Sequence, residues 1–78
     1  MAKVKGWRLI RRTKEMILWK NTHSKFTKKT LMAENIGGVW MVTERINDYA
    51  TKLIGYPLKS KKQAEDVAIR YMKKHLYG

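Results

Sequence analysis

The sequence predicts an α+β fold, in which an antiparallel meander of four or five strands is followed by one C-terminal helix packed on one face of the sheet. Two observations carry this prediction. Short apolar segments of strand length recur up to about residue 56, and turn residues separate them. Residues 60–76 instead place apolar side chains at helical intervals. The chain has 78 residues, the length of a single domain, here residues 1–78.

The C-terminal helix is predicted from its start signal and its apolar stripe. Ser60 and Gln63 have the S-x-x-Q spacing of a capping box, in which each side chain bonds a free backbone N–H of the first turn. The stripe consists of Ala64, Val67, Ala68, Tyr71, Met72, His75 and Leu76. Because the opposite side is charged, the stripe must lie on an apolar surface, and the predicted sheet (residues 6–56) is its natural partner.

The first two strands are predicted over residues 6–12 and 16–20, after a loose basic arm at residues 1–5. Simple alternation in the first strand puts Trp7, Leu9 and Arg11 on one face and Arg8, Ile10 and Arg12 on the other. The second strand is a continuous apolar run. This indicates that both its faces are covered, one by the helix and the other by a dimer partner.

The remaining strands are bounded by turn residues. Thr27 and Thr30 favour a strand over residues 27–35, whereas residues 31–34 are good helix formers. We predict a strand because residues 35–38 make a tight hairpin into the next strand, residues 39–43. Residues 47–48 form a turn pair. A shorter fifth strand, residues 50–56, is expected to end at Gly55 and Pro57. Because Pro57 cannot donate a ladder hydrogen bond, this strand either lies at a sheet edge or stops there.

Charge is the main functional signal. The chain holds 18 Lys and Arg residues against 6 Asp and Glu residues, a net charge of +12. Residues 1–30 carry ten cations and one acid, so most of the excess lies in the first part of the sheet. Such self-repulsion costs stability, and a polyanionic partner explains it. A chain without cysteine also has no disulfide to stabilise it.

A nucleic-acid site is therefore predicted on the opening strands. Lys and Arg contact phosphate oxygens and release condensed counterions, and an aromatic ring beside them can stack on bases. Trp7 is the best stacking candidate and Trp19 the next, although aromatic residues more often form the core of small domains. The predicted site residues are Trp7, Arg8, Arg11, Arg12, Lys14, Lys25, Lys28 and Lys29.

No residue pattern in the chain is typical of catalysis or metal binding. His23 and Ser24 are adjacent but have no third orienting group, and His75 falls on the helix stripe. No two acids show metal-ligand spacing with a histidine. We expect no enzymatic activity, no cofactor, no metal and no small-molecule substrate. Without a secretory signal or a transmembrane-length apolar run, a cytoplasmic location is expected.

The later part of the chain has a strand followed by a capped helix, carried by Trp40, Val42, Ser60, Lys61, Ala64 and Ala68. This pattern, roughly Val39 to Lys74, resembles the arm-binding domains of tyrosine integrases and the related AP2-type domains. The resemblance implies that a three-stranded sheet enters the DNA major groove while the helix braces its back. This chain departs from that pattern by having extra strands and by placing its strongest basic cluster before them.

The function expected from the sequence is nucleic-acid binding, to DNA or RNA, mainly through phosphate contacts with low sequence specificity. The helix-facing side of the sheet should supply the core and the other side should be basic. The alternative is a structural or interaction protein, either a homodimer or a subunit bound to an acidic protein, with residues 16–19 as its interface. A membrane-surface helix over residues 3–19 is disfavoured because Lys14 interrupts its apolar stripe.

Overall fold

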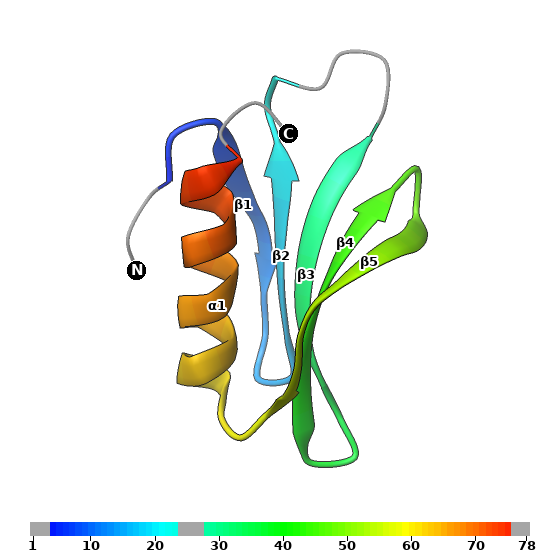
Figure 1. Cartoon of the computed structure of the whole chain (residues 1–78), viewed down its shortest axis with the longest axis vertical. Coiled ribbons are helices and arrows are strands. Elements are labelled where there is room, and N and C mark those ends of the chain that lie inside the picture. The colour runs from blue at the N-terminus through cyan, green and yellow to red at the C-terminus, as the bar shows by residue number, and fades with distance from the viewer. Residues whose placement is uncertain (1–3, 24–27, 76–78) are drawn as a thin grey trace.

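The computed structural model describes residues 4–23 and 28–75, which form one five-stranded antiparallel sheet and one helix (Figure 1). The elements are β1 (Trp7–Arg12), β2 (Met16–Asn21), β3 (Lys29–Ile36), β4 (Val39–Ile46), β5 (Tyr49–Leu58) and α1 (Lys61–Lys74). Each strand pairs with the next along the chain, in the order β1-β2-β3-β4-β5. The predicted α+β fold, a meander followed by a helix, is confirmed.

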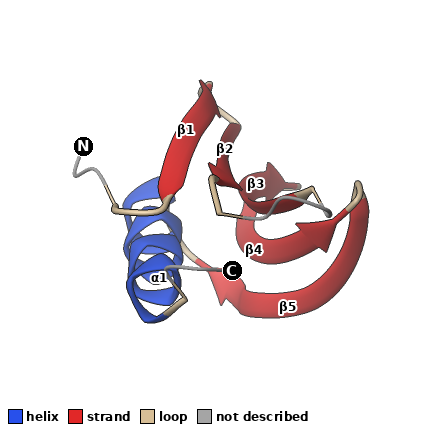
Figure 2. Ribbon diagram, turned by 90° about the horizontal axis from the view of Figure 1, so that it is seen from above, coloured by secondary structure: helices blue, strands red, loops and turns tan. Residues whose placement is uncertain are grey.

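The sheet curls around one side of α1, so that its first and last strands both approach the helix (Figure 2). The core fills the space between them. From α1 it takes Ala64, Ala68 and Met72, all with no exposed surface. The sheet contributes Trp7, Ile17, Trp19, Leu31, Ala33, Trp40, Val42 and Leu58. Val4, which was predicted to belong to a loose arm, also packs in this core.

Two tight turns set the register of β3, β4 and β5. Gly37 and Gly38, between β3 and β4, have φ of 62° and 88°. Asn47 and Asp48, between β4 and β5, have φ of 52° and 70°. Two successive positive φ values are typical of the hairpin turn whose twist matches that of the flanking strands. The hairpin prediction is confirmed, and with it the choice of strand over helix for β3.

The helix start is capped as predicted, with one difference. The Ser60 hydroxyl accepts the backbone N–H of Gln63 at 3.1 Å. The Gln63 side-chain oxygen accepts the N–H of Lys59 at 2.8 Å, one residue earlier than in a standard capping box. The helix ends at Lys74, and the N–H of His75 bonds back to the Met72 carbonyl. Leu76, predicted to extend the stripe, lies outside the described residues.

The fifth strand is longer than predicted. β5 has ten residues and continues through Gly55 and Pro57 to Leu58, so the prediction that these two residues end it is wrong. It is an edge strand paired only with β4, and an edge can accommodate a proline that donates no ladder bond. At Gly55, β5 lies close against α1. A Cβ there would lie 3.0 Å from Val67 Cγ1 and 3.2 Å from Leu58 Cδ1.

Across residues 4–23 and 28–75, no helix has the length and apolarity needed to cross a membrane.

The approach of β5 to α1 yields a stability prediction. Gly55→Ala should lower the free energy of unfolding by about 1–3 kcal/mol, because the new methyl group crowds Val67 and Leu58. Urea unfolding measures this loss. Val67→Ala removes the atom that is crowded, so the double variant should lose less stability than the sum of the two single variants, by at least about 0.5 kcal/mol. Additive losses would show that the crowding is not at Val67.

Candidate nucleic-acid interface

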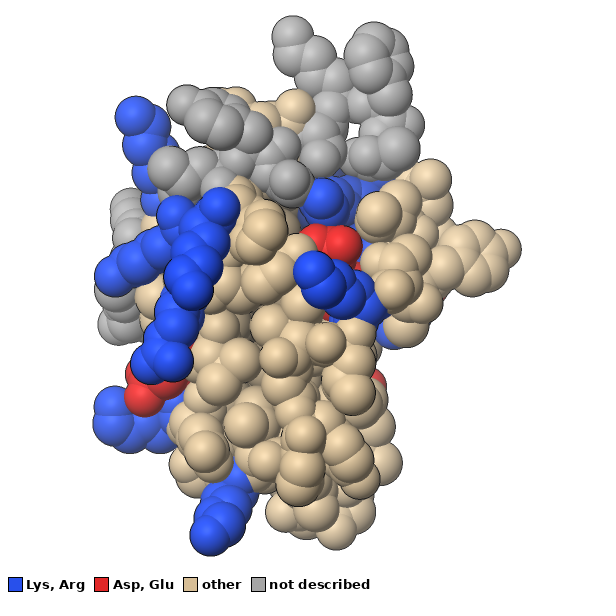
Figure 3. Space-filling model, in the orientation of Figure 1, with Lys and Arg blue, Asp and Glu red and all other residues tan. Residues whose placement is uncertain are grey.

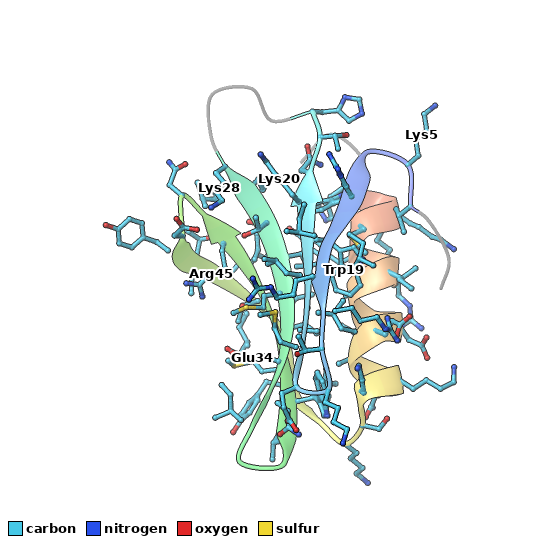
Figure 4. All side chains as sticks on the ribbon, turned by 180° about the vertical axis from the view of Figure 1, so that it is seen from behind. Lys5, Trp19, Lys20, Lys28, Glu34 and Arg45 are labelled. Atoms are coloured by element: carbon cyan, nitrogen blue, oxygen red, sulfur yellow. The ribbon has the colours of Figure 1, made fainter. Side chains whose placement is uncertain are left out.

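The side of the sheet away from α1, here called the open face, carries three cations in one row that spans four strands. The pairing register aligns Arg8 with Lys20, Lys20 with Thr30, and Thr30 with Arg45. We call Arg8, Lys20 and Arg45 the basic row. Strands lie about 4.8 Å apart, so the backbone positions of Arg8 and Arg45 are separated by about 14 Å. Figure 4, seen from behind, shows Lys20, Lys28 and Arg45 above Glu34.

A β-bulge in β1 decides which arginines lie on the open face. The register shifts between Leu9 and Arg11, so Ile10 is the extra residue and alternation reverses after it. Arg11 therefore pairs with Leu18 on the open face, and Arg12 pairs with the core residue Ile17. The prediction that Arg8 and Arg12 share a face is wrong, because it assumed unbroken alternation.

Arg12 has a different role on the helix side. Its Nη2 lies 3.0 Å from Glu65 Oε1 on α1. Nearby, the Lys61 ammonium donates to the Thr13 carbonyl at 2.5 Å. These contacts join the first hairpin to the first half of α1. Arg12 thus helps to attach the edge strand β1 to the helix rather than facing the open side.

The predicted lysines are dispersed. Lys14 is exposed in the turn between β1 and β2, and Lys28 precedes β3, where its Nζ lies 3.2 Å from Asp48 Oδ1. Lys29 faces the helix side, with its Nζ 3.7 Å from Glu44 Oε2. Lys25 lies outside the described residues. Of the predicted cations within the described residues, the structure therefore brings together only Arg8 and Arg11 on the open face.

Lys20 and Arg45, which complete the row, were missed by the site prediction. Lys20 was assigned to the apolar second strand, and Arg45 lies beyond the basic first half of the chain. Only the register shows that both share a row with Arg8. The signal that could have indicated Lys20 is its alternation with the buried Trp19 and Asn21.

The basic row has little acidic compensation. Within the described part of the chain, Arg8, Arg11 and Lys20 form no ion pair. The Arg45 guanidinium donates to the Asp48 carbonyl at 2.7 Å. Glu34 is on the open face but four residues along β3 from Thr30, about 13 Å at 3.3 Å per residue. The positive charge of the row therefore faces solvent.

The tryptophans are in the core, which corrects the expected stacking role. Trp7 is only 7% exposed, and its Nε1 donates to the His75 carbonyl at 2.9 Å. Trp19 and Trp40 are likewise buried. None of the three rings can stack on a base from these positions. The preference of large aromatic residues for the cores of small domains accounts for all three.

A buried polar cluster lies at the helix side of β4. The Tyr71 hydroxyl on α1 donates to Oε2 of the buried Glu44, and the Tyr71 ring stacks on His75 with centroids 4.2 Å apart. Burial, the hydrogen bond to Glu44 and the Glu44 charge all raise the pKa of Tyr71 well above its ordinary 10.0. Tyr71 therefore stays protonated and holds α1 against β4.

The outer face of α1 is a second basic surface. Blue side chains follow the helix along the left of Figure 3. Lys62 pairs with Asp66 at 3.7 Å, while Arg70, Lys73 and Lys74 occupy the later turns. Cations near a helix C-terminus are favoured by the helix dipole, so this surface needs no partner to explain it.

In the part of the chain that the structure describes, no three His, Cys, Asp or Glu side chains gather in a way that could hold a metal ion. The chain matches no protein-family model, no curated protein and no solved structure.

The Tyr71–Glu44 contact yields a pH-dependent prediction. At pH 7, Tyr71→Phe should lower the free energy of unfolding by about 1–3 kcal/mol, because a buried carboxylate loses a hydrogen-bond donor. The folded state raises the pKa of Tyr71. The wild type therefore keeps its full stability advantage over Tyr71→Phe below pH 10.0 and loses it progressively as the pH rises above that value. The difference in free energy of unfolding between the wild type and Tyr71→Phe should therefore become smaller between pH 10 and pH 11. Urea unfolding at pH 7, 9, 10 and 11 measures it.

The matched control for this prediction is Tyr49→Phe, which changes a tyrosine that is 76% exposed. Its stability should equal that of the wild type at pH 7. A difference in free energy of unfolding between the wild type and Tyr71→Phe that stays constant through pH 11 would contradict the hydrogen bond between Tyr71 and Glu44.

Proposed function

We propose that this protein binds nucleic acid through the open face of its sheet, mainly by contacts to backbone phosphates and with low sequence specificity. The observation that supports the proposal is the basic row together with Arg11. The register gathers these four cations on one side, and among the described residues none of the four forms an ion pair.

The chemistry of the row suits phosphate. The guanidinium groups of Arg8, Arg11 and Arg45 can each present a planar pair of N–H donors to phosphate oxygens. The Lys20 ammonium adds a mobile point charge between them. Each neutralised phosphate releases condensed counterions, so affinity should fall steeply with salt. Phosphate contacts carry no base information, which is why we expect weak sequence discrimination.

The alternative of a protein interface over residues 16–19 has less support. Ile17 and Trp19 are committed to the core of their own chain. Only Met16 and Leu18 remain on the open face, where Met16 pairs with Glu34 and Leu18 with Met32. Such an interface would also have to cover the basic row, which would bring like charges together if the partner were a second copy.

The proposal predicts a surface-specific change in salt dependence. Replacing Arg8, Arg11 and Lys20 by Gln should flatten the slope of log affinity against log salt by about 2.7 for duplex DNA or about 2.1 for a single strand, if each side chain neutralises one phosphate. Fluorescence anisotropy of labelled duplex and single-stranded oligonucleotides, from about 50 to 200 mM salt, gives both slopes.

The control is the triple variant of Arg70, Lys73 and Lys74 to Gln on α1, which removes the same charge from the other surface. It should keep most of the wild-type slope. An equal loss in the two triple variants would mean that net charge, and not the open face, drives binding. Absence of wild-type binding near 50 mM salt would overturn the proposed function itself.

A further inference from the structure

Apolar side chains form a strip on the open face directly beside the basic row. The register places Leu18, Met32 and Leu53 in the next row along the strands, at the level of Arg11. The row after that, farther from the basic row, contains Met16, Glu34 and Met41. Adjacent rows on one face are separated by two residues, about 6.6 Å. The cations and the apolar strip are therefore close enough to contact one nucleotide.

An exposed aromatic ring extends this strip. Gly55 pairs with Val42 and Leu58 pairs with Trp40, so across this register shift Tyr56 and Pro57 together lie opposite Met41, which is on the open face. Tyr56 is 58% exposed, and Leu53, on the same side of β5, is 56% exposed. We define the apolar strip as Leu18, Met32, Met41, Leu53 and Tyr56. Its two most exposed members both lie on β5.

The arrangement distinguishes two kinds of nucleic acid. A duplex presents phosphates on its surface and shows base edges only within its grooves. In a single strand the base faces lie free beside their own phosphates, and such strands bind to charged grooves lined with apolar and aromatic side chains. A surface with cations on one side and apolar groups on the other therefore complements a single strand on both sides.

We propose that the open face binds single-stranded nucleic acid in preference to duplex, with phosphates on the basic row and bases on the apolar strip, where Tyr56 stacks on one of them. This inference rests on the proposed function and names its substrate class. Glu34 pairs with Met41, in the row of the strip that is farther from the basic row. It supports the orientation, since a carboxylate there repels phosphates from that side and leaves uncharged base faces unaffected.

The test replaces the exposed part of the strip without changing charge. Leu53→Ser/Tyr56→Ser should weaken binding of an oligothymidine by at least about fivefold, the effect of losing one stacked base. The salt slope should stay at the wild-type value, because no phosphate contact is removed. Affinity for a hairpin duplex should change by less than twofold. Anisotropy titrations of both labelled probes at several salt concentrations provide all three readouts.

The matched control is Leu9→Ser/Tyr49→Ser, which makes the same two replacements at exposed positions of the helix-side rows. It should bind both probes like the wild type. Circular dichroism checks that each double variant is folded. If either is not, the single variants Tyr56→Ser and Tyr49→Ser make the same comparison, with the loss expected only for Tyr56→Ser.

Three results would overturn the inference and leave the proposed function intact. The first is that the wild type binds duplex more tightly than single strand. The second is that the Leu53→Ser/Tyr56→Ser variant loses equal affinity for both probes, and the third is that this variant loses no affinity at all. If the strip instead held a second copy of the chain, sedimentation would show a dimer that the strip variant dissociates, with oligothymidine affinity unchanged. Failure of the wild type to bind either probe would refute both the inference and the proposed function.

Discussion

The structure depends on the close packing of α1 into the curl of the sheet. The helix can approach because it presents Ala64 and Ala68, which are fully buried, and because β5 has a glycine opposite Val67. Small side chains on both partners let the backbones come near, and larger groups would push them apart. This packing assigns one side of every strand to the core. It therefore also determines which cations remain on the open face.

Most of the few acids of the chain form ion pairs, and two of them hold α1 to the sheet. Of six acidic residues, Glu44, Asp48, Glu65 and Asp66 each pair with a lysine or arginine. The Glu65 pair joins α1 to β1, and Glu44 joins α1 to β4 through Tyr71. None of these pairs involves the basic row within residues 4–23 and 28–75. Within the described residues the open face thus stays positive because these four acids pair with cations elsewhere, in addition to the overall excess of cations.

Much of the fold could be predicted because its signals are local. The stripe of α1, its serine cap and the two hairpin turns are each readable within a few residues, and the structure confirms them. The site could be predicted only in part. No glycine or proline in the sequence marks the bulge at Ile10, which depends on how β1 fits against β2 and the helix. The faces predicted for Arg11 and Arg12 were therefore the reverse of those observed. The positions of Lys20 and Arg45 relative to Arg8 follow from pairings between strands distant in sequence, which composition does not encode.

The meander order has a consequence for how the chain loses its conformational freedom. Every strand pairs with its neighbour in sequence, so each hairpin closes a short loop at small entropic cost. The bond from the Trp7 indole to the His75 carbonyl is of another kind, since it spans 68 positions and closes nearly the whole described chain into one ring. The earliest and latest parts of the molecule therefore stabilise each other directly, although the pairing order of the sheet keeps β1 and β5 at opposite edges.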